Sequence, residues 1–340
     1  MKIIDLALVS VLGMSLFAGC ALQEDHESDE PDVAATQDIT GAPVTAEDLM
    51  VAGSALDGRA AAAAEAKAAG ASLIMPASAV SSWFSGSVAP GVTQHWFWNN
   101  SSLTAAFKVG LSPVGASTTS PCQFQVTRAW DVQQFGGERE FHFFIKNTGA
   151  IACGANVLLA AQDRIATWST GGIGVGASQT WTWNNANPLN GSYFVGMSPS
   201  GATTANTCEI EVTRSWYTQL STGERKFNFT LTNTGAIACQ GDVQLALSTA
   251  ADSSWSNGTV GAGATSSWVW NNANPLTRTY VPGLSPTGAS GSTTCQLELT
   301  PTTYQQVIRS DGTAERKFFL GVKNVGTSSC SGTVLLNNLG

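Results

Sequence analysis

The sequence predicts an all-β protein in which three tandem antiparallel β-sandwich copies follow an N-terminal extension. Apolar and polar residues alternate with the two-residue period of strands, motifs recur about every 86 residues, and six cysteines fall two to a copy. Charged residues make up only 12% of the 340 residues and aromatic residues 9%, which excludes a disordered chain. The 35 glycines also argue against a helical bundle.

The first twenty residues predict an export signal. A positive start at Lys2 precedes the mostly apolar run Leu6 to Ala18, which is shorter than the ~20 apolar residues that span a bilayer. The run ends in Leu16-Phe17-Ala18-Gly19-Cys20, which resembles the lipobox of bacterial lipoproteins. A secretory peptide cut at another position is the alternative.

The resemblance to bacterial lipoproteins implies a signal peptide over residues 1–19 and a lipid anchor on Cys20. In that family an aspartate after the cysteine retains the protein at the inner membrane, and here Ala21 takes that place. The resemblance therefore implies an exported protein at the outer membrane or cell surface.

The chain after Cys20 predicts a tether and a spacer. Residues 20–44 are acidic and predict a disordered tether, and the alanine-rich residues 45–70 predict a short helix or a semi-ordered spacer. From Ala66 onward the chain has twelve acidic and fourteen basic residues. This body is near neutral and has no basic patch, so no nucleic-acid partner is expected.

The repeat divides the body into copies at residues 80–160, 165–248 and 252–340. Each copy holds Trp-x-Trp-Asn-Asn, then Gly-x-Ser-Pro-x-Gly, a cysteine, a Glu-Arg pair, an Asn-x-Gly turn and a second cysteine. The proline and last glycine of Gly-x-Ser-Pro-x-Gly predict a turn. The short connection from Ala161 to Thr167 favours a fairly rigid rod of copies.

Each copy predicts six or seven short strands. Cys208, Ile210 and Val212 share one face while the residues between them are polar, which is typical of antiparallel strands with one buried side. This strand number fits a small immunoglobulin-like sandwich, with a closed barrel as the alternative. The stretch Phe227 to Gly235 also resembles a strand and turn of the tandem immunoglobulin-like domains of bacterial surface proteins.

The six cysteines of the body predict three disulfides, one in each copy, as expected for an exported protein. Zinc is the competing use of cysteine, but the sequence has no CxxC pair and no histidine near these positions. The predicted pairs are Cys122 with Cys153, Cys208 with Cys239, and Cys295 with Cys330.

Signals for catalysis are weak. His95 and His142 occur in copy 1 alone, and the positions matching His95 hold Thr180 and Ser267, so surface histidines are predicted. The sequence has no nucleophile elbow, phosphate loop, dinucleotide fingerprint or calcium loop. It therefore predicts no enzyme, no catalytic residue, no cofactor and no metal.

A Glu-Arg pair recurs at the same point of every copy. One interpretation is a bidentate clamp for a carboxylate or phosphate, and the other is a solvated surface pair worth ~0 to 1 kcal/mol. The pairs are Glu138-Arg139, Glu224-Arg225 and Glu315-Arg316.

The Trp-x-Trp-Asn-Asn motifs are the strongest candidate sites. Alternation places both tryptophans of a motif on one face, and that face is either the core or an exposed platform on which sugar rings stack. The candidate ligand-binding residues are Trp96, Trp98, Asn99, Asn100, Trp181, Trp183, Asn184, Asn185, Trp268, Trp270, Asn271 and Asn272.

These observations predict a lipid-anchored cell-envelope protein with a non-catalytic binding role. Surface adhesion or glycan recognition through the three copies is the leading hypothesis, and a scaffold lipoprotein that acts as a spacer or protein-docking surface is the alternative. The expected partners are the membrane, reached through the lipid anchor, and glycans or other cell-surface proteins.

Overall fold

The computed structural model describes residues 35–36, 80–99, 101–184, 186, 191–249, 251–271, 273 and 278–340. The signal peptide, Cys20, the alanine-rich segment and most of the tether lie outside these residues. The tether contributes only strand β1 (Ala35–Thr36), which pairs in parallel with β3 (Thr93–Asn99).

Strands, and no helix, make up the regular structure of the described residues, so the all-β prediction is confirmed. Copy 1 contributes β2 (Val80–Phe84), β3, β4 (Ala105–Val114), β5 (Cys122–Gln133), β6 (Arg139–Asn147) and most of β7 (Gly154–Ser169). Copy 2 contributes β8 (Ser178–Trp183), β9 (Ser192–Ser200), β10 (Cys208–Gln219), β11 (Arg225–Asn233) and β12 (Gln240–Ser248). Copy 3 contributes β13 (Ala251–Ser256), β14 (Thr265–Asn271), β15 (Thr279–Thr287), β16 (Cys295–Leu299), β17 (Thr303–Ile308), β18 (Ala314–Asn324) and β19 (Ser331–Leu339).

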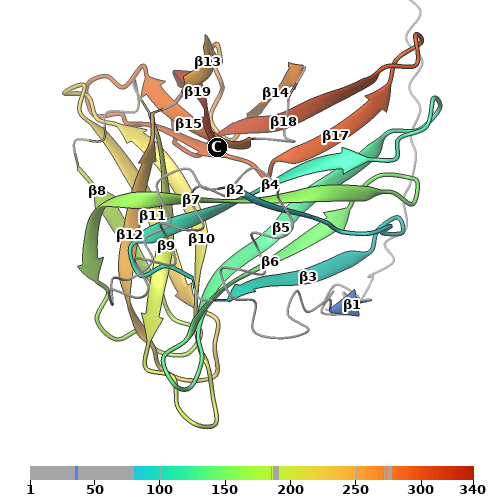
Figure 1. Ribbon diagram of the computed structural model, residues 1–340. Coiled ribbons are helices and arrows are strands. Elements are labelled where there is room, and N and C mark those ends of the chain that lie inside the picture. The colour runs from blue at the N-terminus through green and yellow to red at the C-terminus, as the bar shows by residue number, and fades with distance from the viewer. Residues whose placement is uncertain are drawn as a thin grey trace, which may run out of the picture. The chain divides into compact units, whose positions relative to one another are not determined.

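These strands form three sheets, and two of them combine strands of different copies (Figure 1). The largest has 11 strands and includes β5 and β6 of copy 1, β10 and β11 of copy 2, and β16 to β18 of copy 3. A second sheet joins β2, β4 and β7 to β9 and β12, and a third joins β13, β15 and β19. The copies therefore share backbone hydrogen bonds.

Strand pairing links the copies in a closed cycle. Residues 130–133 pair with 208–211, residues 216–219 with 295–298, and residues 303–306 with 122–125. Each copy thus pairs with both others, and the expected rod, in which the end copies would not touch, is wrong. We name these pairings the first contact (copies 1 and 2), the second contact (copies 2 and 3) and the closing contact (copies 3 and 1).

The connection between copies 1 and 2 is a strand and not a loop. β7 runs without a break over 16 residues. Its first part pairs with β2 and β4, and its last part, Arg164 to Ser169, pairs with β12. The two copies are therefore joined through continuous backbone pairing.

The Gly-x-Ser-Pro-x-Gly segments correct a sequence prediction. They lie in β4, β9 and β15, so most of each segment is strand rather than turn, and only its last glycine, such as Gly115 with φ 106°, lies beyond the strand. Proline is tolerated here because β4 pairs with β7 on one side only among the described strands.

The first glycine of each segment lies against the preceding copy of the cycle. A Cβ atom on Gly196 would lie 2.8 Å from the Cα of Ala106, and one on Gly283 would lie 2.9 Å from the Cα of Ser192. A Cβ on Gly110 would lie 2.9 Å from the Oγ1 of Thr279. Glycine is needed at these positions because any side chain would collide with the neighbouring copy.

Disulfides and buried asparagines fix the interior of each copy. The three predicted disulfides are confirmed, with Cα–Cα distances of 5.9, 5.6 and 5.3 Å. In the Asn-x-Gly turn of copy 1, Asn147 Nδ2 donates to the carbonyls of Val88 and Ile151, and its Oδ1 accepts from Gly149 N. Asn233 and Asn324 make the same bonds in their copies. The turn prediction is therefore confirmed.

Candidate functional site

The tryptophans of the candidate platform face the core. Trp96 is buried at 5% exposure, and its indole N–H donates to Gln94 Oε1 over 3.2 Å. The other five tryptophans of the motifs are partly buried and pack against the central apolar cluster: Trp98, Trp181, Trp183, Trp268 and Trp270. The question that alternation left open is thus decided in favour of the core.

A third tryptophan completes the packing in each copy. Trp168 stacks on Trp183 with ring centroids 6.2 Å apart and an angle of 6° between the planes, and it tilts against Trp181 at 5.9 Å. Trp83 and Trp255 occupy the same place in the other copies. The stacked face of Trp183 is therefore occupied by another indole and is not open to a sugar ring.

The asparagines of the motifs vary in exposure. Asn184 and Asn271 are exposed, whereas the Oδ1 atom of Asn99 is buried without a hydrogen-bond partner among the described residues. Asn100, Asn185 and Asn272 lie outside the described residues. The structure therefore brings no set of polar ligand-binding groups together beside the tryptophans that it describes.

The recurring arginines connect copies. Arg139 Nε donates to the carbonyl of Pro199 over 3.2 Å, and Arg225 Nε donates to that of Pro286 over 3.1 Å. Both acceptors belong to the next copy. These two arginines thus act as neither an open anion clamp nor a partner of the neighbouring glutamate, and both sequence interpretations miss their main contact.

Two further arginines make the ion pairs of the first and second contacts. Arg128 Nε lies 2.8 Å from Glu211 Oε2, and its guanidinium lies 4.3 Å above the Trp130 ring. Arg214 Nη2 lies 2.8 Å from Glu298 Oε2, with its guanidinium 4.6 Å above Trp216. The repeat spacing of Arg128 and Arg214 is visible in the sequence, but their glutamates are visible only once the copies are paired.

Copy 1 carries a histidine cluster on the side of its sheet away from the disulfide. His95 Nε2 lies 2.9 Å from His142 Nδ1, and His142 Nε2 lies 2.8 Å from Glu140 Oε2. His95 also stacks on Trp130 with centroids 5.3 Å apart. Burial, followed by the charges of His142 and Arg128, lowers the pKa of His95 to about 4 although Glu140 opposes the shift. The prediction of surface histidines misses this half-buried network.

A buried carboxyl group lies at the first contact. Asp131 is 5% exposed, and its Oδ2 accepts a 3.0 Å hydrogen bond from the backbone N–H of Met197. Burial raises the pKa of Asp131 to about 8, although the hydrogen bond favours the charged form. The matching positions hold Tyr217 and Tyr304, so the sequence singles out this position by its change of residue type.

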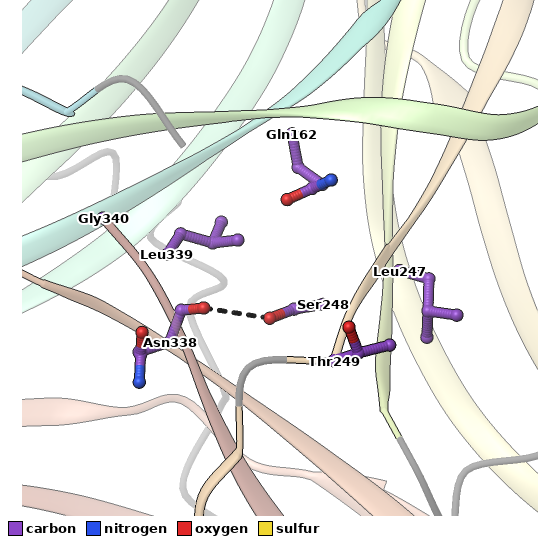
Figure 2. Close-up of a pocket in the computed structure, with 7 residues that line it drawn as sticks. All are labelled: Gln162, Leu247, Ser248, Thr249, Asn338, Leu339 and Gly340. Atoms are coloured by element: carbon purple, nitrogen blue, oxygen red, sulfur yellow. Dashed lines mark hydrogen bonds between the residues drawn. The ribbon is translucent and has the colours of Figure 1, made fainter. Parts of the chain in front are cut away.

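A hollow of about 230 Å³ lies between the ends of β12 and β19 and the middle of β7. Figure 2 shows the residues that line it. Ser248 Oγ donates to the carbonyl of Asn338 over 3.0 Å across this hollow. The lining residues come from β7, β12 and β19 and the residues beside them: Gln162, Leu247, Ser248, Thr249, Asn338, Leu339 and Gly340. None of them is an acid, a base or a nucleophilic thiol.

The comparisons with known proteins add no assignment. The chain matches no family model, no curated protein and no solved structure. Among the described residues, no group of three or more histidine, cysteine, aspartate or glutamate side chains is arranged to hold a metal ion. The described part of the chain also contains no helix long and apolar enough to span a membrane.

Proposed function

We propose that this protein is a lipid-anchored scaffold of the bacterial cell envelope, without catalytic activity, that docks extended segments of partner proteins on exposed strand edges. In this proposal its body consists of three tandem immunoglobulin-like β-sandwiches, each with its own disulfide. Cys20 carries the lipid and holds the body at the outer membrane or cell surface.

Two edge strands carry the docking proposal. β8 pairs with β11 and β14 pairs with β18, and neither has a second partner among the described strands. Both strands lack charged residues and proline, which proteins commonly use to protect an exposed edge. An extended peptide can add to such an edge through main-chain hydrogen bonds. The equivalent strand β3 pairs with β1 of this same chain, which supports strand addition on this side.

The tryptophan packing favours a scaffold over glycan recognition. A sugar-stacking platform needs exposed ring faces, whereas these rings pack against one another and against the core. The recurring arginines are likewise occupied by contacts between copies. These contacts support a body whose tryptophans and recurring arginines are occupied internally, which leaves the uncharged edges of β8 and β14 for docking.

The docking proposal is tested by photo-crosslinking in cells. A crosslinking amino acid placed at Thr180, on the edge strand β8, should yield adducts with envelope proteins. The same residue at Thr213 is the control, because Thr213 is also exposed but lies on β10, with β11 between it and the edge. Equal adducts at both positions, or none at Thr180, would contradict docking on this edge.

Two further measurements separate the parts of the proposal. Incorporation of labelled palmitate should be lost in Cys20→Ser, and label that persists would reject the anchor at Cys20. In a glycan screen, binding that Trp183→Ala abolishes without unfolding the protein would replace the scaffold proposal with glycan recognition.

A further inference from the structure

The closing contact differs from the first and second contacts in its side chains. In those two contacts an arginine stacks on a tryptophan and pairs with a glutamate of the next copy, as with Arg214, Trp216 and Glu298. The matching residues of the closing contact are Pro301, Thr303 and Gln125, and the register pairs Thr303 with Gln125 as it pairs Trp216 with Glu298. The closing contact therefore has neither the ion pair nor the cation–π contact.

The closing contact also lacks the hydrogen bond from an arginine to a proline carbonyl that the other two contacts have. Arg316 matches Arg139 and Arg225, which donate to proline carbonyls of the next copy. Its Nε is buried and has no hydrogen-bond partner among the described residues. A buried donor without a partner destabilises the arrangement that holds it.

The polar contacts that remain are made mainly by two glutamines. Gln306 Oε1 accepts from the backbone N–H groups of Gly115 and Ala116, at 2.9 and 3.0 Å. Gln305 Nε2 donates to Gln123 Oε1 over 3.2 Å. Neutral hydrogen bonds of this kind are weaker than charge-assisted ones.

Chain connectivity also distinguishes the closing contact. Copies 1 and 2 are joined directly through β7, and copies 2 and 3 through the two residues between β12 and β13. The partners in the closing contact lie far apart in sequence, with Gly115 and Gln306 separated by 191 positions. In addition, Pro301 lies in the break between β16 and β17, where β5 and β10 of the other copies are single strands.

We propose that the closing contact opens reversibly and that β17 then pairs in trans with β5 of a second copy of this chain. The two edges are complementary because they already pair within one molecule, over Thr303–Gln306 and Cys122–Gln125. Two opened molecules can exchange these edges reciprocally, so every backbone bond of the closing contact forms again in the dimer. This inference depends on the contacts between copies and not on the proposed docking function.

Cysteines placed across the contact test the exchange. The full-length protein carries Cys20→Ser so that the introduced thiol is the free one, and the variants Gln123→Cys and Gln305→Cys are mixed and oxidised mildly. Exchange gives a covalent dimer that contains one chain of each kind. Thr218→Cys mixed with Gln296→Cys is the matched control, because these residues pair at the equivalent position of the second contact. Each pair is also placed in one chain, where an internal crosslink should form because the residues face each other.

We expect about tenfold more mixed dimer from the closing contact than from the control, as the loss of an ion pair and a cation–π contact suggests. Installing the missing pair with Gln125→Glu and Pro301→Arg should reduce the yield towards that of the control. A yield from the closing contact no higher than that of the control would overturn the proposal. If the installed pair leaves the yield of mixed dimer unchanged, the claim that the missing ion pair and cation–π contact weaken the closing contact is wrong.

Discussion

Asp131 of copy 1 holds the backbone N–H of Met197 in copy 2 through a 3.0 Å hydrogen bond, inside a contact where the carboxyl group is 5% exposed. The other two copies have Tyr217 and Tyr304 at this position, which are fully buried in their own copies. Copy 1 therefore carries a titratable group in the first contact that the repeat does not require.

Asp131→Asn should change how stability depends on pH. The pKa of Asp131 is about 8 in the folded protein against 3.8 for the ordinary group, so between these values the folded state holds a proton that the unfolded state has lost. The free energy of unfolding contributed by this group therefore falls as pH rises through that window, by at most about 1.4 kcal/mol per pH unit. Asparagine keeps an acceptor for Met197 N–H and does not titrate. Urea unfolding at pH 5 and pH 8 should show that the unfolding free energy of the variant, relative to that of the wild type, is higher at pH 8 than at pH 5. An equal difference at both pH values would contradict this.

Gly196→Ala should weaken the first contact. The added methyl group would lie 2.8 Å from the Cα of Ala106, a backbone atom that cannot move aside easily, so a loss of about 1–3 kcal/mol in unfolding free energy is expected. Gly172→Ala is the control, because a Cβ atom there meets nothing within 4 Å. Equal effects of the two substitutions in chemical denaturation would show that Gly196 is not needed for close approach.

Local patterns predicted the interior of the copies, whereas contacts between copies escaped prediction. Alternation and cysteine spacing identified the strand faces and all three disulfides, since both depend on residues close in sequence or on the repeat. The pairing of Thr303 with Gln125 depends on two edges that only the folded chain brings together. The Gly-x-Ser-Pro-x-Gly pattern predicts a turn at Pro113 because proline is common in turns, but one-sided pairing lets this residue lie in β4.

In the candidate site, too, the local pattern predicts part of the structure and packing between sheets decides the rest. Alternation placed Trp181 and Trp183 on one face, yet it could not say which face was buried, because the residue between them is Phe97, Thr182 or Val269 in the three copies. The position of Trp168 across from both indoles decides the question, and this depends on packing between sheets.

Trp181→Ala should destabilise the body by about 3 kcal/mol, because truncating a packed indole leaves a cavity. Thr180→Ala is the control on the neighbouring, exposed position of the same strand, where a change within about 0.5 kcal/mol is expected. Guanidinium unfolding with the disulfides intact measures both. Similarly small losses of unfolding free energy in both variants would indicate that Trp181 is exposed, and would support the hypothesis that sugar rings stack on it.

The ion pair of the second contact should be measurable as a coupling energy. Arg214→Gln, Glu298→Gln and the double variant form a cycle whose interaction term is expected at about 0.5–1 kcal/mol, since the guanidinium is partly exposed. The term should shrink at high salt because screening weakens exposed pairs. The matching residues of the closing contact, Pro301 and Gln125, carry no charge. A cycle of Pro301→Ala, Gln125→Ala and their double variant should therefore give a smaller term, and a larger one would contradict the difference between these contacts.

His95→Thr should reduce the acid sensitivity of copy 1. The pKa of His95 is about 4 in the folded protein against 6.5 for the ordinary group, so between these values the unfolded state holds a proton that the folded state lacks. The free energy of unfolding therefore falls as pH is lowered from 6.5 towards 4. Desolvation is the main cause of the lowered pKa of His95, and a proton on His95 would also add a positive charge near Arg128 and His142.

Copy 2 has Thr180 at the position of His95, so threonine suits the strand. Unfolding followed by fluorescence from pH 7 to pH 4 should show a shallower decline in His95→Thr, and an unaltered decline would mean that His95 does not titrate in this window.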